Sequence, residues 1–368
     1  MLKDVPRDDE VARVTPRAFA PVVGEAAMSS KQKGQPRPRQ GAGRVTLSDV
    51  AALLGITKMT VSRALHSPHL VSEKTLERVK DAVQQMGYMP DLVAGSLASN
   101  RSRLVIALVP STASGVFRHT LPVLSEKLSA AGYQLLVAQT NEAGANFDVS
   151  LEAVIGRRPA AIVIGGVVRA HATKQKLLSS GIPVLEMWDT TRSPVDMLIG
   201  FSHAAVGKVA AAHVAAKACT KPVVVSSDDE WAQKRSQSFR SAFRGVRAIP
   251  AVTVAMPATL GDIHRTLLKF FHENPDVDSI FCADDVCTLA VLLGMRRDAP
   301  KIPKDVQLIG FSDQELIDDD VGLPLTTIRA NGAEIGAVAA EKLIARLDHE
   351  AKAMRRFNVA FSTDEAGY

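Results

Sequence analysis

The segment from residue 45 to residue 97 constrains the fold of this chain more than any other part of the sequence. Thr46 can cap a helix, because Asp49 follows it three positions later, close to the pattern of a capping box. Gly55 can end that helix in a left-handed turn, and Thr57 can cap a second helix only two residues further on. Two short helices joined by such a tight turn form a helix-turn-helix. The sequence therefore predicts this motif here.

The second of these helices is patterned as a DNA-recognition helix. Val61 and Leu65 lie one turn apart on its buried side, which turns other residues outward. The outward residues are Lys58, Met59, Ser62 and Arg63. Outward residues near the N-terminus of such a helix meet base edges in the major groove of DNA. Arg63 is the best candidate for direct base reading, because an arginine fork pairs with two acceptors of guanine.

A third helix follows and supplies a small core. Ser72 can cap it, Gly87 can end it and Pro90 prevents its continuation. Its apolar residues recur at helical spacing, and they are Leu76, Val79, Val83 and Met86. We therefore expect a helical domain over residues 44–90, in which the third helix holds the first two in place.

The chain before this domain has the composition of a disordered arm. Residues 1–43 mix Pro, Gly, Arg, Gln and Ser without sustained periodicity. The net charge of the chain is only +5, but residues 31–44 carry several basic side chains and no acid. A positive end suits the phosphates of double-stranded DNA, although a solvated tail without a partner would show the same charge.

From residue 104 onward the pattern changes to alternating strands and helices. The β-rich runs are 104–110, 134–138, 160–164, 184–187, 223–225, 279–281, 306–309 and 326–328. Helical segments such as Ala204 to Lys217 and Ala333 to Leu347 separate many of them. This alternation indicates βαβ units around parallel sheets, and a length of roughly 265 residues favours two such units. A ligand of such a fold binds outside the carboxyl ends of the strands.

These motifs together resemble the LacI family of sugar-responsive repressors. The resemblance rests on Val45 to Ala52, Thr57 to Leu65, and Val71-Ser72 through to Gly87-Tyr88-Met89-Pro90, and it continues to about residue 360. Within the family, Pro183 to Asp189, Ser193-Pro194 and Gly200-Phe201 are most similar to the gluconate-repressor branch. The resemblance implies an effector domain over residues 104–368 like that of type I periplasmic sugar-binding proteins. Such a domain has two doubly wound subdomains, three crossover strands and a ligand cleft between them.

The resemblance also implies the residues that contact operator DNA. Residues 91–103 match the hinge helix, which folds on the operator and inserts a leucine into the minor groove, where an apolar wedge kinks DNA. Asp91 and Gly95 depart from the family pattern, and an ordinary linker is the alternative interpretation. The predicted DNA-binding residues are Thr46, Ser48, Thr57, Lys58, Met59, Thr60, Ser62, Arg63, His66, Tyr88, Ala94 and the wedge Leu97.

Residues at strand ends are the candidates for effector binding. Arg235 matches the ligand-anchoring arginine of the family, and a guanidinium fork suits a carboxylate or a vicinal diol. Carboxylates such as Glu186 and Asp189 accept hydrogen bonds from sugar hydroxyls. The other candidates are Ser111, Thr112, Phe117, Phe201, Asp284, Asp285, Phe311, Ser312 and Asp313. Each polar residue alone could equally be a helix cap or a solvated charge.

We therefore expect a cytoplasmic, homodimeric repressor that binds a palindromic operator and is released by a sugar acid such as gluconate. Alternatives are a LacI-type regulator that responds to another sugar or to a corepressor, and a solute-binding protein. The phosphate-loop, nucleophile-elbow and zinc-protease motifs are missing, so we expect no enzyme, cofactor or metal site. The three cysteines indicate no disulfide framework and a reducing compartment, and we expect Cys282 and Cys287 to be buried thiols. No apolar run is long enough to span a membrane.

Overall fold

The structure is a computed structural model, and it divides into two compact units, Met1–Pro90 and Asp91–Tyr368. The predicted arm lies outside the described residues, as does all of the hinge except residues 102 and 103. The structure describes residues 45–89, 102–110, 115–140, 145–244, 248–256, 258–297, 306–311, 325–348 and 356–365.

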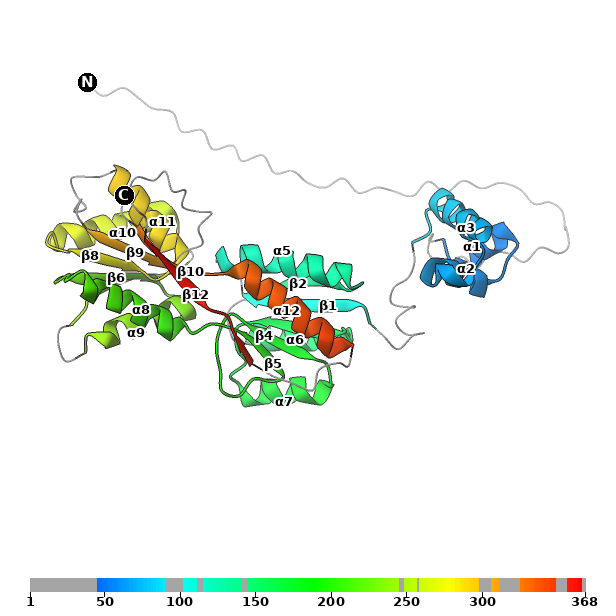
Figure 1. Ribbon diagram of the computed structural model, residues 1–368, viewed down its shortest axis with the longest axis horizontal. Helices are drawn as coiled ribbons and strands as arrows, with labels where there is room; N and C mark the ends of the chain where they lie inside the picture. Colours follow the sequence, from blue (N-terminus) through cyan, green and yellow to red (C-terminus); the bar gives the residue numbers. More distant parts are fainter. Residues whose placement is uncertain are drawn as a thin grey trace, which may run out of the picture. The chain divides into compact units, whose positions relative to one another are not determined.

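The first unit is the predicted helical domain. Its elements are α1 (Leu47–Leu54), α2 (Lys58–His66), a short 3-10 helix (Pro68–Leu70) and α3 (Glu73–Met86) (Figure 1). Thr46 and Asp49 form the capping box, Gly55 ends α1 with a φ of 66°, and the Thr57 hydroxyl accepts from the Thr60 amide. The helix-turn-helix is thus confirmed, with its caps.

The three helices share a small core. Its buried members are Val50, Ala51, Val61, Ala64, Val79 and Ala82. Leu76, Val83 and Met86 pack against this core, as their helical spacing predicts. The guanidinium of Arg78 on α3 donates to the carbonyl oxygen of Leu54, the last residue of α1, at 3.1 Å. This places a cation at the negative end of the α1 dipole and ties α3 to the turn.

The described residues of the second unit form two six-stranded sheets (Figure 1). The first sheet has the order β11-β5-β4-β3-β1-β2 and is parallel throughout. The second has the order β12-β10-β9-β8-β6-β7, in which β12 alone of the described strands runs antiparallel to its neighbour. The strands of the first sheet are β1 (Leu104–Pro110), β2 (Gln134–Thr140), β3 (Ala161–Gly165), β4 (Val184–Met187), β5 (Met197–Gly200) and β11 (Arg356–Asn358). Those of the second are β6 (Pro222–Ser227), β7 (Ala251–Val254), β8 (Ser279–Cys282), β9 (Gln307–Phe311), β10 (Leu325–Ala330) and β12 (Phe361–Glu365).

Helices cover both faces of each sheet, as expected for doubly wound units. On the first sheet, α5 (Gly115–Ala130) and α12 (Gly332–Leu347) cover one face, and α6 (Ala145–Gly156) and α7 (His171–Ser180) the other. On the second, α8 (His203–Ala216) and α9 (Glu230–Ala242) lie opposite α10 (Leu260–Glu273) and α11 (Asp285–Arg297). One hydrophobic cluster runs through both sheets, so the two subdomains share a core.

The chain passes between the two subdomains three times, as the family resemblance implies. It crosses after β5 into α8, after β10 into α12, and between β11 and β12. Phe201 marks the first crossing, and its ring lies 5.8 Å from the ring of Phe311 and 6.5 Å from that of Phe361. The Val359 amide donates to the Gly200 carbonyl oxygen at 2.9 Å, so neighbouring crossings are hydrogen-bonded to each other.

Two of the three cysteines lie in the core. Cys282 and Cys287 are buried as predicted, and burial raises the pKa of both thiols, whereas Cys219 is only partly buried.

Within the described part of the chain, none of the helices combines the length and the apolar character needed to cross a bilayer.

Candidate functional sites: the recognition helix and the cavity between the subdomains

The outer face of α2 presents the residues that the sequence predicts for DNA contact. Met59 is 62% exposed, and Lys58 and Arg63 are exposed beside it. Thr60 and Ser62 are half-buried on the same helix, and Thr57 stands exposed at its N-terminus. This face can carry two cations and one apolar side chain into a groove.

The remaining predicted DNA-binding residues have other positions. Thr46 caps α1, while Ser48 in its first turn is half-buried. Tyr88 packs against the core of the helical domain formed by α1, α2 and α3, which we call the headpiece, so it has a structural role as well. His66 ends α2, but its side chain is outside the described part, as are Ala94 and Leu97.

The second unit contains a cavity of about 510 Å³ between its two subdomains. This volume suits a small ligand such as a hexose derivative. The first subdomain contributes the ends of β1, β2 and β3, part of α6 and the start of α7, and the second contributes the start of α9. The cavity therefore lies at the carboxyl ends of parallel strands, where this fold class binds ligands. The lining residues are Pro110, Thr140, Phe147, Asp148, Ile164 to Ala170, Thr173, Asp189, Asp229, Glu230 and Trp231.

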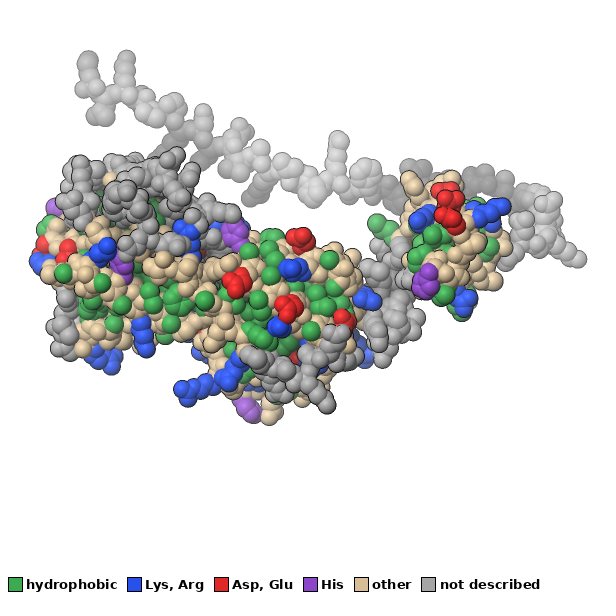
Figure 2. Space-filling model, viewed as in Figure 1, with side chains coloured by type: hydrophobic (Ala, Val, Ile, Leu, Met, Phe, Trp, Pro, Cys, Tyr) green, Lys and Arg blue, Asp and Glu red, His purple; other side chains and the backbone are tan. Residues whose placement is uncertain are grey.

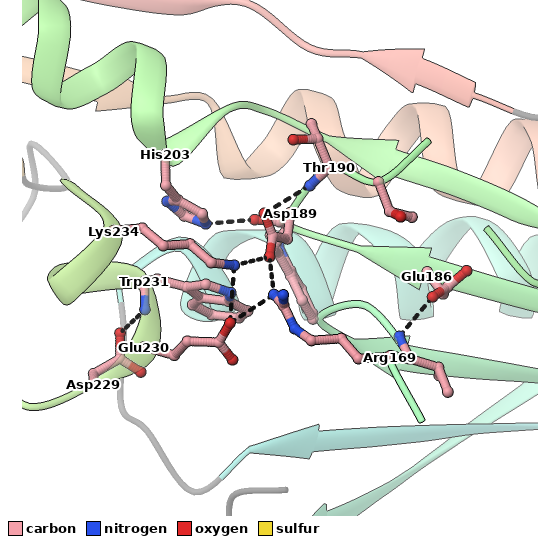
Figure 3. A network of polar contacts seen from close by, with 12 residues as sticks. Arg169, Glu186, Asp189, Thr190, His203, Asp229, Glu230, Trp231 and Lys234 are labelled. Atoms are coloured by element: carbon pink, nitrogen blue, oxygen red, sulfur yellow. Dashed lines mark hydrogen bonds and ion pairs between the residues drawn. The ribbon is translucent and has the colours of Figure 1, made fainter. Parts of the chain in front are cut away.

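Four charged side chains join the two subdomains at this cavity (Figure 3). Arg169 follows β3 and Asp189 follows β4, whereas Glu230 and Lys234 stand one turn apart on α9. The Arg169 guanidinium contacts Glu230 at 2.6 Å and Asp189 at 3.2 Å. The Lys234 ammonium contacts Glu230 at 3.0 Å and also pairs with Asp189. We call these four residues the charge quartet. Each carboxylate bridges both cations. The quartet has no net charge, because it holds two carboxylates and two cations.

A strained residue aims Asp189 at the cavity. Trp188 has a φ of 66°, a left-handed conformation that costs a bulky residue about 1–3 kcal/mol. Several contacts hold it there: its indole Nε1 donates to the Thr120 hydroxyl at 3.1 Å, and its ring packs edge-on against Phe117 at 4.3 Å. The chain turns sharply at Trp188, and this turn directs the Asp189 carboxylate toward Arg169 and Lys234 (Figure 3).

Glu186 supports the cavity wall from behind. Its two carboxylate oxygens accept from the backbone amides of Val168 and Val195, each at 2.7 Å. Val168 belongs to the cavity lining, so the buried carboxylate fixes the loop that carries Arg169. Burial raises the pKa of Glu186, although the two amide donors oppose this effect. A structural role in the loop therefore accounts for Glu186 fully.

A buried chain of contacts lies beside the cavity and spans the first crossing. The His203 ring stacks on Trp231, with 5.3 Å between the ring centroids, and its Nε2 lies 2.8 Å from the Trp188 carbonyl oxygen. Its Nδ1 lies 2.8 Å from the Arg235 guanidinium. An arginine can only donate, so His203 is neutral, with Nδ1 as acceptor and Nε2–H as donor. Burial is the main cause that lowers the pKa of His203 well below its ordinary value.

Arg235 is enclosed in this chain. It is 4% exposed, its Nε donates to the Ala283 carbonyl oxygen, and its guanidinium lies 4.1 Å from the centre of the Phe311 ring. Burial lowers the pKa of Arg235, while three nearby aspartates raise it. The structure thus gives Arg235 hydrogen-bond and ring contacts to protein groups, and its role as ligand anchor stays a prediction.

The other predicted effector residues divide into three groups. Asp189 lines the cavity. Phe117 packs against Trp231, another lining residue, with 5.7 Å between the ring centroids. Phe201, Phe311, Asp284 and Asp285 lie in the second subdomain or at the crossing, where Asp284 accepts from the Ser227 and Cys287 amides. Ser111, Thr112, Ser312 and Asp313 are outside the described residues.

Four residues at the cavity were not predicted from the sequence, and they are Arg169, Glu230, Trp231 and Lys234. Arg169 lies four residues after β3, at a strand end that the sequence already predicts, so the strand-end argument could have found it. Glu230 and Trp231 follow β6 in the same way. No local pattern marks Lys234, because its pairing with the cavity residue Asp189 depends on the packing of α9.

Comparison with known proteins finds family matches in both units of the chain. A family model for bacterial regulatory proteins of the lacI family matches residues 46–91, and one for a periplasmic binding protein-like domain matches residues 211–361. The transcriptional regulator GntR of Pseudomonas aeruginosa is 30% identical over 82% of this chain and 89% of its own length.

Solved structures agree as well. A LacI family regulator from Silicibacter pomeroyi is 30% identical, with a TM-score of 0.78 over 87% of this chain and 98% of that one. The operator-bound dimer of the Lac repressor has a TM-score of 0.71 at 19% identity over 88% of this chain and 98% of its own, which shows the shared fold. The chain is therefore a DNA-binding transcriptional regulator, not an enzyme, and it belongs to the LacI family of bacterial regulatory proteins.

Proposed function

We propose that this regulator represses genes of sugar-acid uptake or catabolism and leaves its operator when gluconate or a similar sugar acid binds. Residues 44–90 bind DNA, residues 91–103 form the hinge, and residues 104–368 bind the effector and dimerise. Arg63 reads a base, while Lys58 and Met59 adjust the preference for neighbouring bases. Effector and operator then favour different states of one dimer, which couples the two binding reactions.

The observation that carries the choice of a sugar acid is a pair of cations at the cavity: Arg169 lines it, and Lys234 pairs with the lining residues Asp189 and Glu230. Arg169 and Lys234 approach each other from the two subdomains around shared carboxylate partners. Two such cations can hold the carboxylate of a ligand, while the acids and the Thr140 hydroxyl oxygen offer acceptors to its hydroxyls. Trp231 offers an apolar ring for the carbon chain. The resemblance to the gluconate-repressor branch, and the relatives named GntR, support the same ligand.

An exposed apolar edge supports the proposed dimer. β2 is the edge strand of the first sheet, and its Leu136 and Val137 are 50% and 45% exposed. Figure 2 shows hydrophobic side chains gathered on the same face of this subdomain as the helices α5 and α12. Exposed apolar edge strands are sites of association with a second chain. The Lac repressor, which shares this fold, was solved as a dimer on its operator.

Calorimetric titration of the full-length protein with gluconate tests the effector assignment. We expect Lys234→Met to weaken gluconate binding about tenfold or more, because a charge-assisted contact of roughly 1.5–3 kcal/mol is lost. Lys269→Met, at an exposed position on α10, is the matched control and should bind like the wild type. Failure of the wild-type protein to bind gluconate would refute the assignment, and so would equal binding by the Lys234→Met variant.

A further inference from the structure

Glu230 and Asp189 occupy equivalent places in the charge quartet but differ in how firmly they are held. The Asp189 side chain is only 5% exposed, and its Oδ1 accepts from the Thr190 amide at 2.7 Å. The Glu230 side chain is 57% exposed, and Glu230 is the first residue of α9. Exposed ion pairs contribute at most about 1 kcal/mol, so the Glu230 carboxylate can leave the two cations at little cost. Asp189 is thus the fixed carboxylate of the quartet, and Glu230 is the exchangeable one.

The position of the Glu230 carboxylate is also the position that an anionic ligand would take. Its Oε1 lies 2.6 Å from the Arg169 guanidinium and 3.0 Å from the Lys234 ammonium (Figure 3). Glu230 and Arg169 both line the cavity. A ligand carboxylate that kept these two contacts would overlap the glutamate. If Glu230 stayed in place, the ligand would add one negative charge to a neutral quartet and would be repelled at close range.

We propose that Glu230 is a tethered counter-ion that occupies the carboxylate subsite of the cavity and is displaced by the carboxylate of the effector. When the ligand enters, the Glu230 side chain turns toward solvent and the ligand carboxylate takes its place between Arg169 and Lys234. The charge balance of the quartet is kept, because one carboxylate replaces another. A neutral sugar has no group that compensates the two cations, so it cannot displace Glu230 and meets a cavity that is narrowed by this side chain.

The exchange also changes what joins the two subdomains. With Glu230 in place, the second subdomain is bound to Arg169 of the first subdomain through its own side chain. With the acid bound, the ligand itself bridges Arg169 and Lys234. Glu230 therefore determines which class of ligand can bind. It also determines the ligand concentration at which the ligand replaces the ion pair between Glu230 and Arg169. This inference rests on the proposed sugar-acid function.

The test compares gluconate with sorbitol, which carries a neutral hydroxymethyl group where gluconate has its carboxylate. Calorimetric titrations use the full-length wild type, Glu230→Gln and Glu334→Gln. The last variant is the matched control, since Glu334 is also an exposed acid in the first turn of a helix, α12, away from the cavity lining. Tryptophan fluorescence gives a second readout, because Trp231 lies next to Glu230 in the cavity.

We expect Glu230→Gln to bind gluconate roughly three- to tenfold more tightly than the wild type, since two exposed pairs no longer compete with the ligand. Sorbitol binding should not tighten, and Glu334→Gln should behave like the wild type. Weaker or unchanged gluconate binding by Glu230→Gln, beside a wild type that binds, would overturn the inference and leave the proposed function intact. An equal gain for sorbitol would also overturn it, because the gain would then not depend on the carboxylate of the ligand. If neither wild type nor Glu230→Gln binds gluconate, both the function and the inference fail.

Discussion

The contact between α8 and α9 permits a quantitative prediction, because Gly207 lies where the two helices meet. A methyl carbon at Gly207 would overlap the Arg235 carbonyl oxygen and would lie 2.8 Å from the Phe239 backbone nitrogen. Alanine in place of glycine stabilises a helix by about 1 kcal/mol, so propensity alone predicts a gain. The overlapping atoms are backbone atoms, which can yield only if α9 moves, and such overpacking costs about 1–3 kcal/mol or more. We expect the steric cost to exceed the gain, with a net destabilisation of Gly207→Ala by about 1–2 kcal/mol.

Thermal and urea unfolding of the full-length protein measure this effect. For a domain of this size, such a change lowers Tm by roughly 2–8 °C. Gly261→Ala is the control, because a methyl group there meets the Thr259 hydroxyl at an ordinary 3.7 Å and should be neutral or stabilising. Gluconate binding should weaken as well, since Glu230, Trp231 and Lys234 move with α9. A Tm for Gly207→Ala equal to or above that of the wild type would refute the packing argument.

Two further predictions concern the headpiece and the buried histidine. Arg63→Ala should cost roughly 1–3 kcal/mol of specific operator binding with little change on unrelated DNA, and unchanged specific affinity would remove Arg63 from the base contacts. Burial lowers the pKa of His203 well below 6.5, so the unfolded chain binds more protons than the folded chain between these two values. Stability should therefore fall as the pH is lowered through this window, and it should gain nothing from this group above pH 6.5. The variant His203→Gln can donate to the Trp188 carbonyl oxygen and accept from Arg235, so its unfolding free energy should depend less on pH; an unchanged dependence would contradict the assigned protonation state.

The sequence was sufficient for elements whose signals are local. The helix-turn-helix was predicted together with its caps, because Thr46, Gly55 and Thr57 act within a few residues of their own position. Eight strands were predicted from compact β-rich runs. β5, β7, β11 and β12 were not predicted. Length does not separate them from the predicted strands, since β4 and β8 are also only four residues long. β11 pairs with β5, more than 150 residues earlier in the chain.

The cavity was predicted in position but only partly in content. Asp189 was found because it directly follows a strand, and this rule needs only the order of the elements. Lys234 and Arg235 show its limit: they are neighbours on α9, yet one pairs with Asp189 at the cavity and the other is buried against Phe311. Successive helix residues point about 100° apart, so a prediction must also know the rotation of the helix about its axis. The packing of α9 on α8, which tertiary contacts decide, sets this rotation.

The most direct test of the account measures binding of the full-length protein to its own promoter DNA by fluorescence anisotropy, with and without gluconate. The salt concentration must be fixed, because phosphate contacts make DNA affinity strongly salt-dependent. We expect tight, sequence-specific binding that gluconate weakens and that sorbitol at the same concentration leaves unchanged. If gluconate leaves the affinity for promoter DNA unchanged, gluconate is not the effector. If gluconate raises this affinity, the effector does not release the protein from DNA.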